Sequence, residues 1–177
     1  MPRTVRVGLV ADTHGFVDPG LERLFAGCDL LLHAGDVGKE AVLASLGALA
    51  PVRAVRGNVD ELGPLEDLPE VLRVDLGGLV ALLVHDLGPP DAPRLPAARA
   101  IALHRPEIVV HGHSHRPGHA LVEGVLFVNP GSAGPRRFSL PRAAGILEVE
   151  GRSARLDLFD LAGPVPVPFG ETLRAAL

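Results

Sequence analysis

The sequence is poor in several residue types, and each shortage excludes a class of protein. Its 177 residues include one cysteine, Cys28, so an internal disulfide framework is excluded. Cys28 stands in the apolar stretch CDLLLH, which is typical of a small buried side chain rather than a reactive thiol. Lys39 is the only lysine and the net charge is −4, which argues against a general nucleic-acid binding protein with its usual basic surplus.

Long apolar runs are also absent. No uncharged stretch approaches the roughly 18 residues that a membrane helix needs. The apolar run near the N-terminus is short and ends at Asp12, which is unlike a secretory signal peptide. We therefore expect a cytoplasmic protein with no membrane partner.

What the sequence has in plenty is hydrophobic residues, at 47%, arranged in short runs that end at glycine or polar residues. Strands are predicted where these runs are β-branched and unbroken, and helices where the apolar spacing follows a helical face. In the first half this gives a β-α-β-α-β order, which implies parallel strands with helices on the faces of a sheet. The predicted segments are a strand at 4–11, a helix at 19–26, a strand at 28–34, a helix at 39–47 and a strand at 51–56.

The second half changes character. Gly77-Gly78 joins two extended runs, which is a strong hairpin signal. Further strands are expected at 107–111, 120–122 and 125–128, with a short helix at 97–104 after a proline-rich loop at 88–96, and a final hairpin at about 143–149 and 154–159. We expect one α/β domain over 1–177, with a core of about 5–160 and a surface tail at 161–177.

Polar residues stand where the apolar strands stop. Five predicted strands are followed by carboxylate, amide or imidazole groups, and ligands of open α/β sheets bind at the carboxyl ends of strands. Two of the motifs, D-T-H and H-S-H, have i, i+2 spacing, which directs both side chains to one side of extended backbone. The residues concerned are Asp12, His14, Asp36, Asn58, His85, His113 and His115.

This set indicates a metal site. Mixed imidazole and carboxylate without clustered thiolate suits Mn²⁺, Fe or Zn²⁺ better than a dedicated Mg²⁺ or Ca²⁺ site. Seven ligands are too many for one transition ion but suit two ions that share a bridging ligand. We expect two divalent ions, with Mn²⁺ favoured and Fe, Zn²⁺ or Ni²⁺ as alternatives.

Together these motifs resemble the calcineurin-like metallophosphoesterase superfamily, whose series runs D-x-H, G-D, G-N-x-[D/E], H and G-H-x-H. The flanks VRGNVD, GHSHRP and VNPGS resemble its small bacterial and archaeal phosphodiesterase branch, which shares its fold with the retromer-subunit scaffold of eukaryotes. The resemblance spans about residues 5–140. It implies a four-layer αββα sandwich of two mixed β-sheets flanked by helices, with the metal site at the carboxyl ends of the strands.

The resemblance also implies a role for each ligand. Asp36 would bridge the two ions, and Asp36, Asn58 and His113 are the expected catalytic residues. The first ion would be held by Asp12, His14 and His115, and the second by Asn58, His85 and His113.

Two positions depart from the family pattern. Val59 stands where many members carry a histidine that protonates the leaving group or stabilises the transition state, although the small phosphodiesterase branch commonly lacks it. Asp86 follows His85 where glycine is common. Asp86 could orient a ligand imidazole, or it could simply face water.

Other polar residues have simpler interpretations. Asp60 and Arg56 could support Asn58 or form a surface ion pair, and the turn at 129–132 is expected to have a structural role around the ligands. His33 and His111 are expected in the core or behind the ligands, and His104 and His119 on the surface.

The function predicted is hydrolysis of a small phosphate ester, a phosphodiester by preference, by a hydroxide that two divalent metals share. A metal-binding scaffold with weak catalysis is the first alternative, because Val59 cannot donate a proton. An exonuclease of the same superfamily is the second, and the acidic charge weighs against it. The exposed hairpins could support a homodimer.

Overall fold

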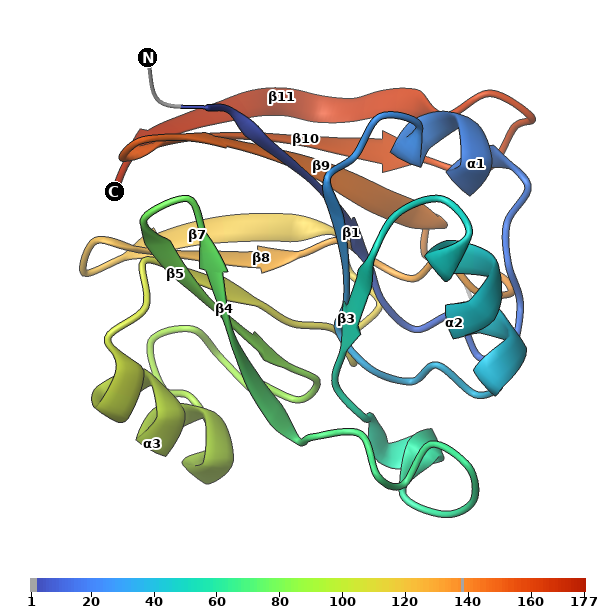
Figure 1. The fold of residues 1–177 in the computed structure, drawn as a ribbon, viewed down its shortest axis with the longest axis horizontal. Helices are drawn as coiled ribbons and strands as arrows, with labels where there is room; N and C mark the ends of the chain where they lie inside the picture. Colours follow the sequence, from blue (N-terminus) through green and yellow to red (C-terminus); the bar gives the residue numbers. More distant parts are fainter. Residues whose placement is uncertain (1–2, 138) are drawn as a thin grey trace.

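Two β-sheets packed face to face form the centre of the molecule in the computed structural model, which describes residues 3–137 and 139–177 (Figure 1). The six-stranded sheet has the order β11-β10-β9-β1-β2-β3. Its strands β1 to β3 are parallel and come from the βαβ half of the sequence, whereas β9, β10 and β11 add to it in antiparallel fashion. The bounds are β1 Val5–Val10, β2 Leu30–His33, β3 Val52–Ala54, β9 Ala143–Glu150, β10 Ser153–Asp160 and β11 Val167–Ala176.

The five-stranded sheet has the order β4-β5-β6-β8-β7. Strands β5, β6 and β8 run parallel, and β4 and β7 close the two edges in antiparallel orientation. Gly77 and Gly78 turn the β4–β5 hairpin with φ of +70° and +108°, a conformation that favours glycine. The bounds are β4 Val71–Leu76, β5 Leu79–Val84, β6 Ile108–Val110, β7 Gly118–Val122 and β8 Val125–Asn129.

Helices cover the outer face of each sheet and complete four layers. The largest hydrophobic cluster lies between the sheets, where Leu9 and Leu32 of one meet Leu83 and Val110 of the other. A second cluster packs α1 and α2 on the six-stranded sheet, and a third packs α3 on the five-stranded sheet. The helices are α1 Gly20–Phe25, α2 Glu40–Gly47 and α3 Leu95–His104, with a 3-10 turn, η1, at Asn58–Asp60. This confirms the predicted αββα sandwich.

The C-terminal segment differs from the sequence prediction. Residues 161–177, expected as a surface tail, contain β11, which pairs with β10 along the edge of the six-stranded sheet. Most of β11 is exposed, and its sequence VPFGETLRAA lacks the apolar run that marked the other strands. Leu173 and Leu177 nevertheless pack against the inter-sheet core. In the described residues, no helix is long and apolar enough to cross a membrane.

The topology brings the carboxyl ends of both parallel sets to one edge. Strands β1, β2 and β3 lead into Asp12, Asp36 and Asn58, and β5 and β6 lead into His85 and the 112–115 turn. The polar residues predicted from strand ends therefore lie around one place, between the two sheets.

Candidate metal centre

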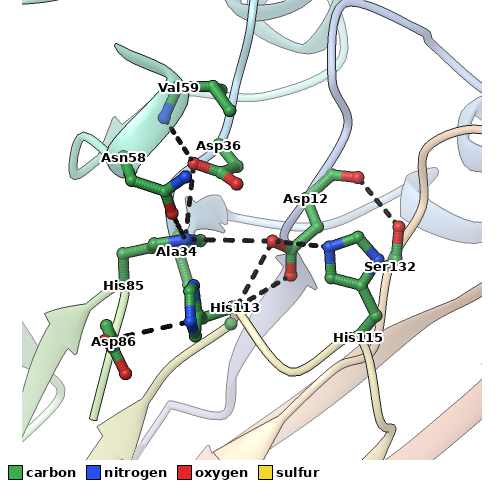
Figure 2. Close-up of polar contacts among 12 residues, drawn as sticks. Asp12, Ala34, Asp36, Asn58, Val59, His85, Asp86, His113, His115 and Ser132 are labelled. Atoms are coloured by element: carbon green, nitrogen blue, oxygen red, sulfur yellow. Dashed lines mark hydrogen bonds and ion pairs between the residues drawn. The ribbon is translucent and has the colours of Figure 1, made fainter. Parts of the chain in front are cut away.

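Five of the seven predicted ligands form two overlapping groups that could each hold a metal ion. Asp12, His14 and His115 form one group, and Asp12, Asp36 and His85 form the other, with the ligand atoms of each group within 4.8 Å of one another. Figure 2 shows Asp12 between His115 on one side and Asp36 with Asn58 on the other. Because the groups share the fully buried Asp12 carboxylate, they form adjoining halves of one centre.

In the first half, two imidazoles converge on one carboxylate. The Nε2 atom of His115 lies 3.3 Å from Asp12 Oδ1 and 3.3 Å from His14 Nε2. Two ring nitrogens so close cannot both carry a proton toward each other. At least one presents a lone pair, which is the form that binds a cation. Burial, followed by the charge of Arg137, lowers the pKa of His14 and favours its neutral form.

In the second half, a hydrogen bond sets the tautomer of His85. Its Nδ1–H donates to the Ala34 carbonyl over 2.8 Å, so in the neutral ring Nε2 carries the lone pair. That nitrogen lies 3.2 Å from Asn58 Oδ1 and 3.3 Å from Asp36 Oδ1. Acceptors this close repel one another unless a proton or a metal ion lies between them. The donor set therefore fits a cation.

The pKa values of this pair carry the same information. Burial alone would lower the pKa of His85, but the hydrogen bond and charge of Asp36, with Asp12, raise it above its ordinary value. Burial would raise the pKa of Asp36, but His85 and the Val59 N–H, 3.0 Å from Asp36 Oδ1, lower it. Asp36 is thus favoured in its charged form, and its carboxylate attracts positive charge to the position of His85 Nε2, where a proton or a metal ion can supply it.

Asp36 faces both halves of the centre. Its Oδ1 lies on the His85 side, and its Oδ2 lies 3.8 Å from His14 Nε2 in the other half. This orientation suits the bridging role that the family resemblance implies for Asp36.

The remaining predicted ligands, Asn58 and His113, are less enclosed. Asn58 reaches the centre through the contact between its Oδ1 and His85. The His113 ring stands edge-on to that of His85, with centroids 5.2 Å apart, and its side chain is 45% exposed. The His113 backbone N–H donates to Asp12 Oδ2 over 3.1 Å, so this residue also fixes a ligand through its main chain.

Asp86 lies behind His113 rather than facing water alone. Its Oδ2 is 3.9 Å from His113 Nε2 and 2.8 Å from an Arg94 guanidinium nitrogen. The 3.9 Å separation from His113 is longer than a hydrogen bond, so an orienting role for Asp86 stays a prediction. Arg94 was missed, because it belongs to the loop at 88–96, which follows no motif.

Backbone strain around the centre is concentrated at the predicted ligands themselves. Five of the predicted ligands have positive φ. In residues other than glycine this conformation costs free energy, and it occurs most often at functional sites. Glycines allow the close approach, since a Cβ at Gly57 would come 2.1 Å from Asp36 Oδ1 and one at Gly112 would come 2.9 Å from Asp12 Oδ2. The five are Asp12 (+53°), His14 (+48°), Asp36 (+54°), His113 (+68°) and His115 (+56°).

Buried hydrogen bonds hold the ligand loops together. Ser132 Oγ donates to the Asp12 carbonyl over 2.9 Å, and Asn129 Nδ2 donates to the Gly112 carbonyl over 2.9 Å. The turn at 129–132 therefore braces two ligand loops, in agreement with its expected structural role. Its own turn is closed by the Gly131 N–H, which donates to Asn129 Oδ1.

Asp60 forms a second brace of this kind. Its buried carboxylate accepts hydrogen bonds from the N–H groups of Val37, Gly38 and Gly57, at 2.8–2.9 Å. These donors lie in the loops that carry Asp36 and Asn58. The alternative of a surface ion pair with Arg56 is wrong, because Arg56 donates instead to the carbonyls of Glu66 and Leu68.

His33 lies in the interior behind the first ligand loop, as expected. Its Nε2 is 2.9 Å from Thr13 Oγ1, and that hydroxyl is also 3.0 Å from the Val37 carbonyl. If Thr13 donates to Val37, then His33 donates to Thr13, and the buried Nδ1 of His33 has no hydrogen-bond partner among the described residues. Burial lowers the pKa of His33 to about 4 and that of His111 to about 4. His119 is exposed and His104 is half-buried.

Comparisons with a family model and with a known relative indicate the same family. Residues 5–152 match the calcineurin-like phosphoesterase superfamily domain. A probable metallophosphoesterase of Methanocaldococcus jannaschii is 30% identical over 135 residues, which cover 73% of this chain and 68% of that protein.

Solved structures share the fold. Vacuolar protein sorting 29 of Cryptosporidium parvum has a TM-score of 0.81 at 21% identity, covering 98% of this chain and 99% of that one. Vps29 of Entamoeba histolytica, solved in complex with Zn²⁺, has a TM-score of 0.77 at 22% identity, covering 96% and 99%. At these identities the likeness concerns the fold.

Proposed function

The chain belongs to the calcineurin-like phosphoesterase superfamily, and on that premise we propose that it is a binuclear metal-dependent phosphodiesterase. The observation that supports this most is the pair of ligand groups that share Asp12, with the two Asp36 oxygens directed to opposite halves. Two adjoining cation sites of mixed imidazole and carboxylate suit a phosphoryl group, whose oxygens carry the charge to be offset.

The proposed ligands follow the two halves of the centre. Asp12, His14 and His115 would hold one ion, Asn58, His85 and His113 the other, and Asp36 both. Mn²⁺ is the favoured ion, with Fe, Zn²⁺ or Ni²⁺ compatible with the same donors. When bound, such ions lower the pKa of a coordinated water and offset the negative charge of the phosphate.

The chain's own residues have defined tasks in the hydrolysis. The water gives one proton to solvent as its oxygen bonds to phosphorus, the P–O bond to one ester group breaks with its electron pair on the departing oxygen, and that oxygen takes a proton. Asn58 and His113, at the open side of the centre, are placed to orient the phosphate. Val59 offers no proton at the neighbouring position, so the proton comes from solvent. Esters of acidic alcohols or phenols, which leave readily as anions, are therefore preferred.

A scaffold function is the competing proposal. The fold of Vps29 proteins supports it, as does the lack of a proton donor at Val59. The retained ligand set supports the enzyme, because a protein that only binds partners gains nothing from five ligand residues held at positive φ.

The deciding experiment uses metal-stripped protein and bis(p-nitrophenyl) phosphate. We expect turnover to return with Mn²⁺, and to fall at least about 100-fold in His115→Ala. His119→Ala removes an exposed imidazole from β7 and is the matched control, with activity close to that of the unaltered protein. A series with Zn²⁺, Ni²⁺ and Fe²⁺ ranks the ions. Absence of turnover with every ion, together with retained metal binding, would favour the scaffold.

A further inference from the structure

The loop that carries Asn58 separates two hollows of different chemistry. Asn58 lines one of them, and the next residue, Val59, lines the other. Val59 also donates its N–H to Asp36 Oδ1, so a residue that lines the second hollow contacts a proposed metal ligand through its main chain. Figure 2 shows Val59 above Asp36 and Asn58 beside Asp36, the two being neighbours on this loop.

The first hollow, which we name the polar cleft, has a volume of about 260 Å³ and includes Asn58, His85 and His113 in its lining. Arg56 and Arg94 bring positive charge to it, and Glu61, Glu70 and Asp86 bring negative charge. Both arginines are held in place, Arg56 by two backbone carbonyls and Arg94 by Asp86.

This mixture of charges favours one kind of ligand group. A purely anionic group would meet Glu61 and Glu70, and a purely cationic group would meet Arg56 and Arg94. Hydroxyl groups suit both, because each can donate to a carboxylate and accept from a guanidinium. A sugar or similar polyol is therefore the occupant that the polar cleft fits.

The second hollow, which we name the apolar hollow, has a volume of about 360 Å³. Val59, Leu62, Pro64 and Leu65 line it, and Leu62 is 86% exposed while Val59 is 45% exposed. Lys39 and Glu40 bring opposite charges to its lining, and the carboxylate of Asp60, also in the lining, is turned to three backbone N–H groups. Apolar side chains left in water beside a reaction centre favour an apolar group of the ligand.

We propose that the substrate is a mixed phosphodiester, with a hydroxyl-bearing group in the polar cleft and an apolar, aryl-like leaving group in the apolar hollow. A monoester has one organic group and would leave one hollow empty, whereas a diester has two. The assignment of the apolar group as the one that leaves follows from Val59, which cannot supply a proton. This inference rests on the proposed phosphodiesterase function. It adds the chemical nature of the two organic groups that the phosphate joins.

Binding without turnover is the first test. Phosphonate analogues replace the scissile ester oxygen by carbon, so their dissociation constants can be measured by calorimetry with Mn²⁺ present. The three analogues correspond to thymidine 5′-(p-nitrophenyl phosphate), bis(p-nitrophenyl) phosphate and methyl p-nitrophenyl phosphate. We expect the thymidine analogue to bind at least about fivefold more tightly than either of the others, because only it brings a hydroxyl-bearing group to the polar cleft and an aryl group to the apolar hollow.

Matched variants then assign each hollow. Leu62→Ser should weaken all three analogues about fivefold, and Leu103→Ser, which alters a leucine on α3 that is 76% exposed and outside both hollows, should not. Glu61→Ala should weaken only the thymidine analogue, by about threefold, while Glu66→Ala on the same loop should leave all three unchanged.

Equal binding of the three analogues, or equal effects of Leu62→Ser and Leu103→Ser, would overturn the inference. Such a result with Mn²⁺-dependent turnover of bis(p-nitrophenyl) phosphate leaves the phosphodiesterase proposal intact. The opposite result, with the expected order of binding but no turnover of any diester, retains the two hollows and removes the catalytic proposal.

Discussion

Gly57 is the residue on which the space around Asp36 most directly depends. A Cβ there would lie 2.1 Å from Asp36 Oδ1 and 2.3 Å from Asp36 N, so neither the carboxylate nor the backbone can stay in place. We expect Gly57→Ala to reduce Mn²⁺ affinity by at least about tenfold in calorimetric titration, comparable to the loss of a residue that supports a ligand. Gly47→Ala is the matched control, since no atom of residues 3–137 or 139–177 would clash within 4 Å of a Cβ at Gly47. Equal affinities of the two variants would contradict this role.

In the proposed hydrolysis, Val59 stands where a histidine could protonate the leaving oxygen. We expect Val59→His to raise kcat for diesters of poorly leaving alkyl alcohols by about 100-fold, the usual contribution of a placed general acid, and to change aryl esters much less. The ratio of alkyl to aryl rates, measured at saturating Mn²⁺, checks this. Val59→Asn is the control, because it adds polarity without an acid. A uniform change on both classes of ester would mean that leaving-group protonation is not limiting.

His33 makes stability depend on pH. Its pKa is about 4 in the folded protein and about 6.5 when unfolded, so between these values the unfolded chain binds the extra proton. The stabilisation is present above pH 6.5 and is lost as the pH falls toward 4. From pH 7 to pH 5 we expect the free energy of unfolding to drop by about 2 kcal/mol from this residue.

The measurement is urea unfolding at both pH values with a chelator present. In His33→Gln, the free energy of unfolding should fall between pH 7 and pH 5 by about 2 kcal/mol less than in the unaltered protein. His104→Gln should show the same fall as the unaltered protein. An unchanged pH dependence in His33→Gln would show that the buried imidazole is not the group concerned.

At the scale of elements, Asp60 ties the turn η1 to the loop after β2. Removing its carboxylate in Asp60→Ala leaves three backbone N–H groups without their partner, and we expect the free energy of unfolding to fall by about 3 kcal/mol. Denaturant unfolding measures this, and Asp67→Ala, at an exposed position of the same segment, should change stability by less than about 0.5 kcal/mol. A loss as small as that of Asp67→Ala would mean that the two loops hold together without the brace.

The elements that could be predicted from sequence are those with a buried face. Strand β1 is an unbroken apolar run that stops at Asp12, and the four buried positions Val7–Val10 explain why the run is so clear. Strand β11 lies at a sheet edge with most residues exposed, so packing does not impose an apolar pattern on it. Edge pairing depends on backbone hydrogen bonds, which leave little signature in side chains.

The candidate site was predictable to the same extent and for a related reason. Strand ends placed Asp12, Asp36 and His85 together because parallel strands end at one edge. Side-chain directions beyond that were not predictable, as Asp60 and Arg94 show. Asp60 turns inward to three N–H groups, and Arg94 reaches Asp86 from a loop without a motif. Such contacts depend on how loops from distant parts of the sequence meet.

For the whole molecule, metal binding should act as a stabiliser. The ligands come from both sheets, so bound ions hold the native arrangement and not the unfolded chain. At a free Mn²⁺ concentration of 100 times the dissociation constant, we expect each bound ion to raise the free energy of unfolding by about 2.7 kcal/mol. This corresponds to a rise in Tm of roughly 5–10 °C for each ion. Thermal unfolding with Mn²⁺ and with excess chelator measures it. Asp36→Asn, which alters the carboxylate proposed to hold both ions, should remove most of the difference, and a Tm that is insensitive to chelator would contradict the expectation.

The hydrogen bond from Ser132 to the Asp12 carbonyl joins residues 120 positions apart, and Gly134 donates to the same carbonyl. It has a consequence for biosynthesis. The N-terminal part of a chain is made first, so Asp12 and His14 exist well before the residues that complete their surroundings. The centre acquires its final shape only when nearly three quarters of the protein has been synthesised. A metal ion that requires this final shape can therefore bind only after about three quarters of the chain has been made.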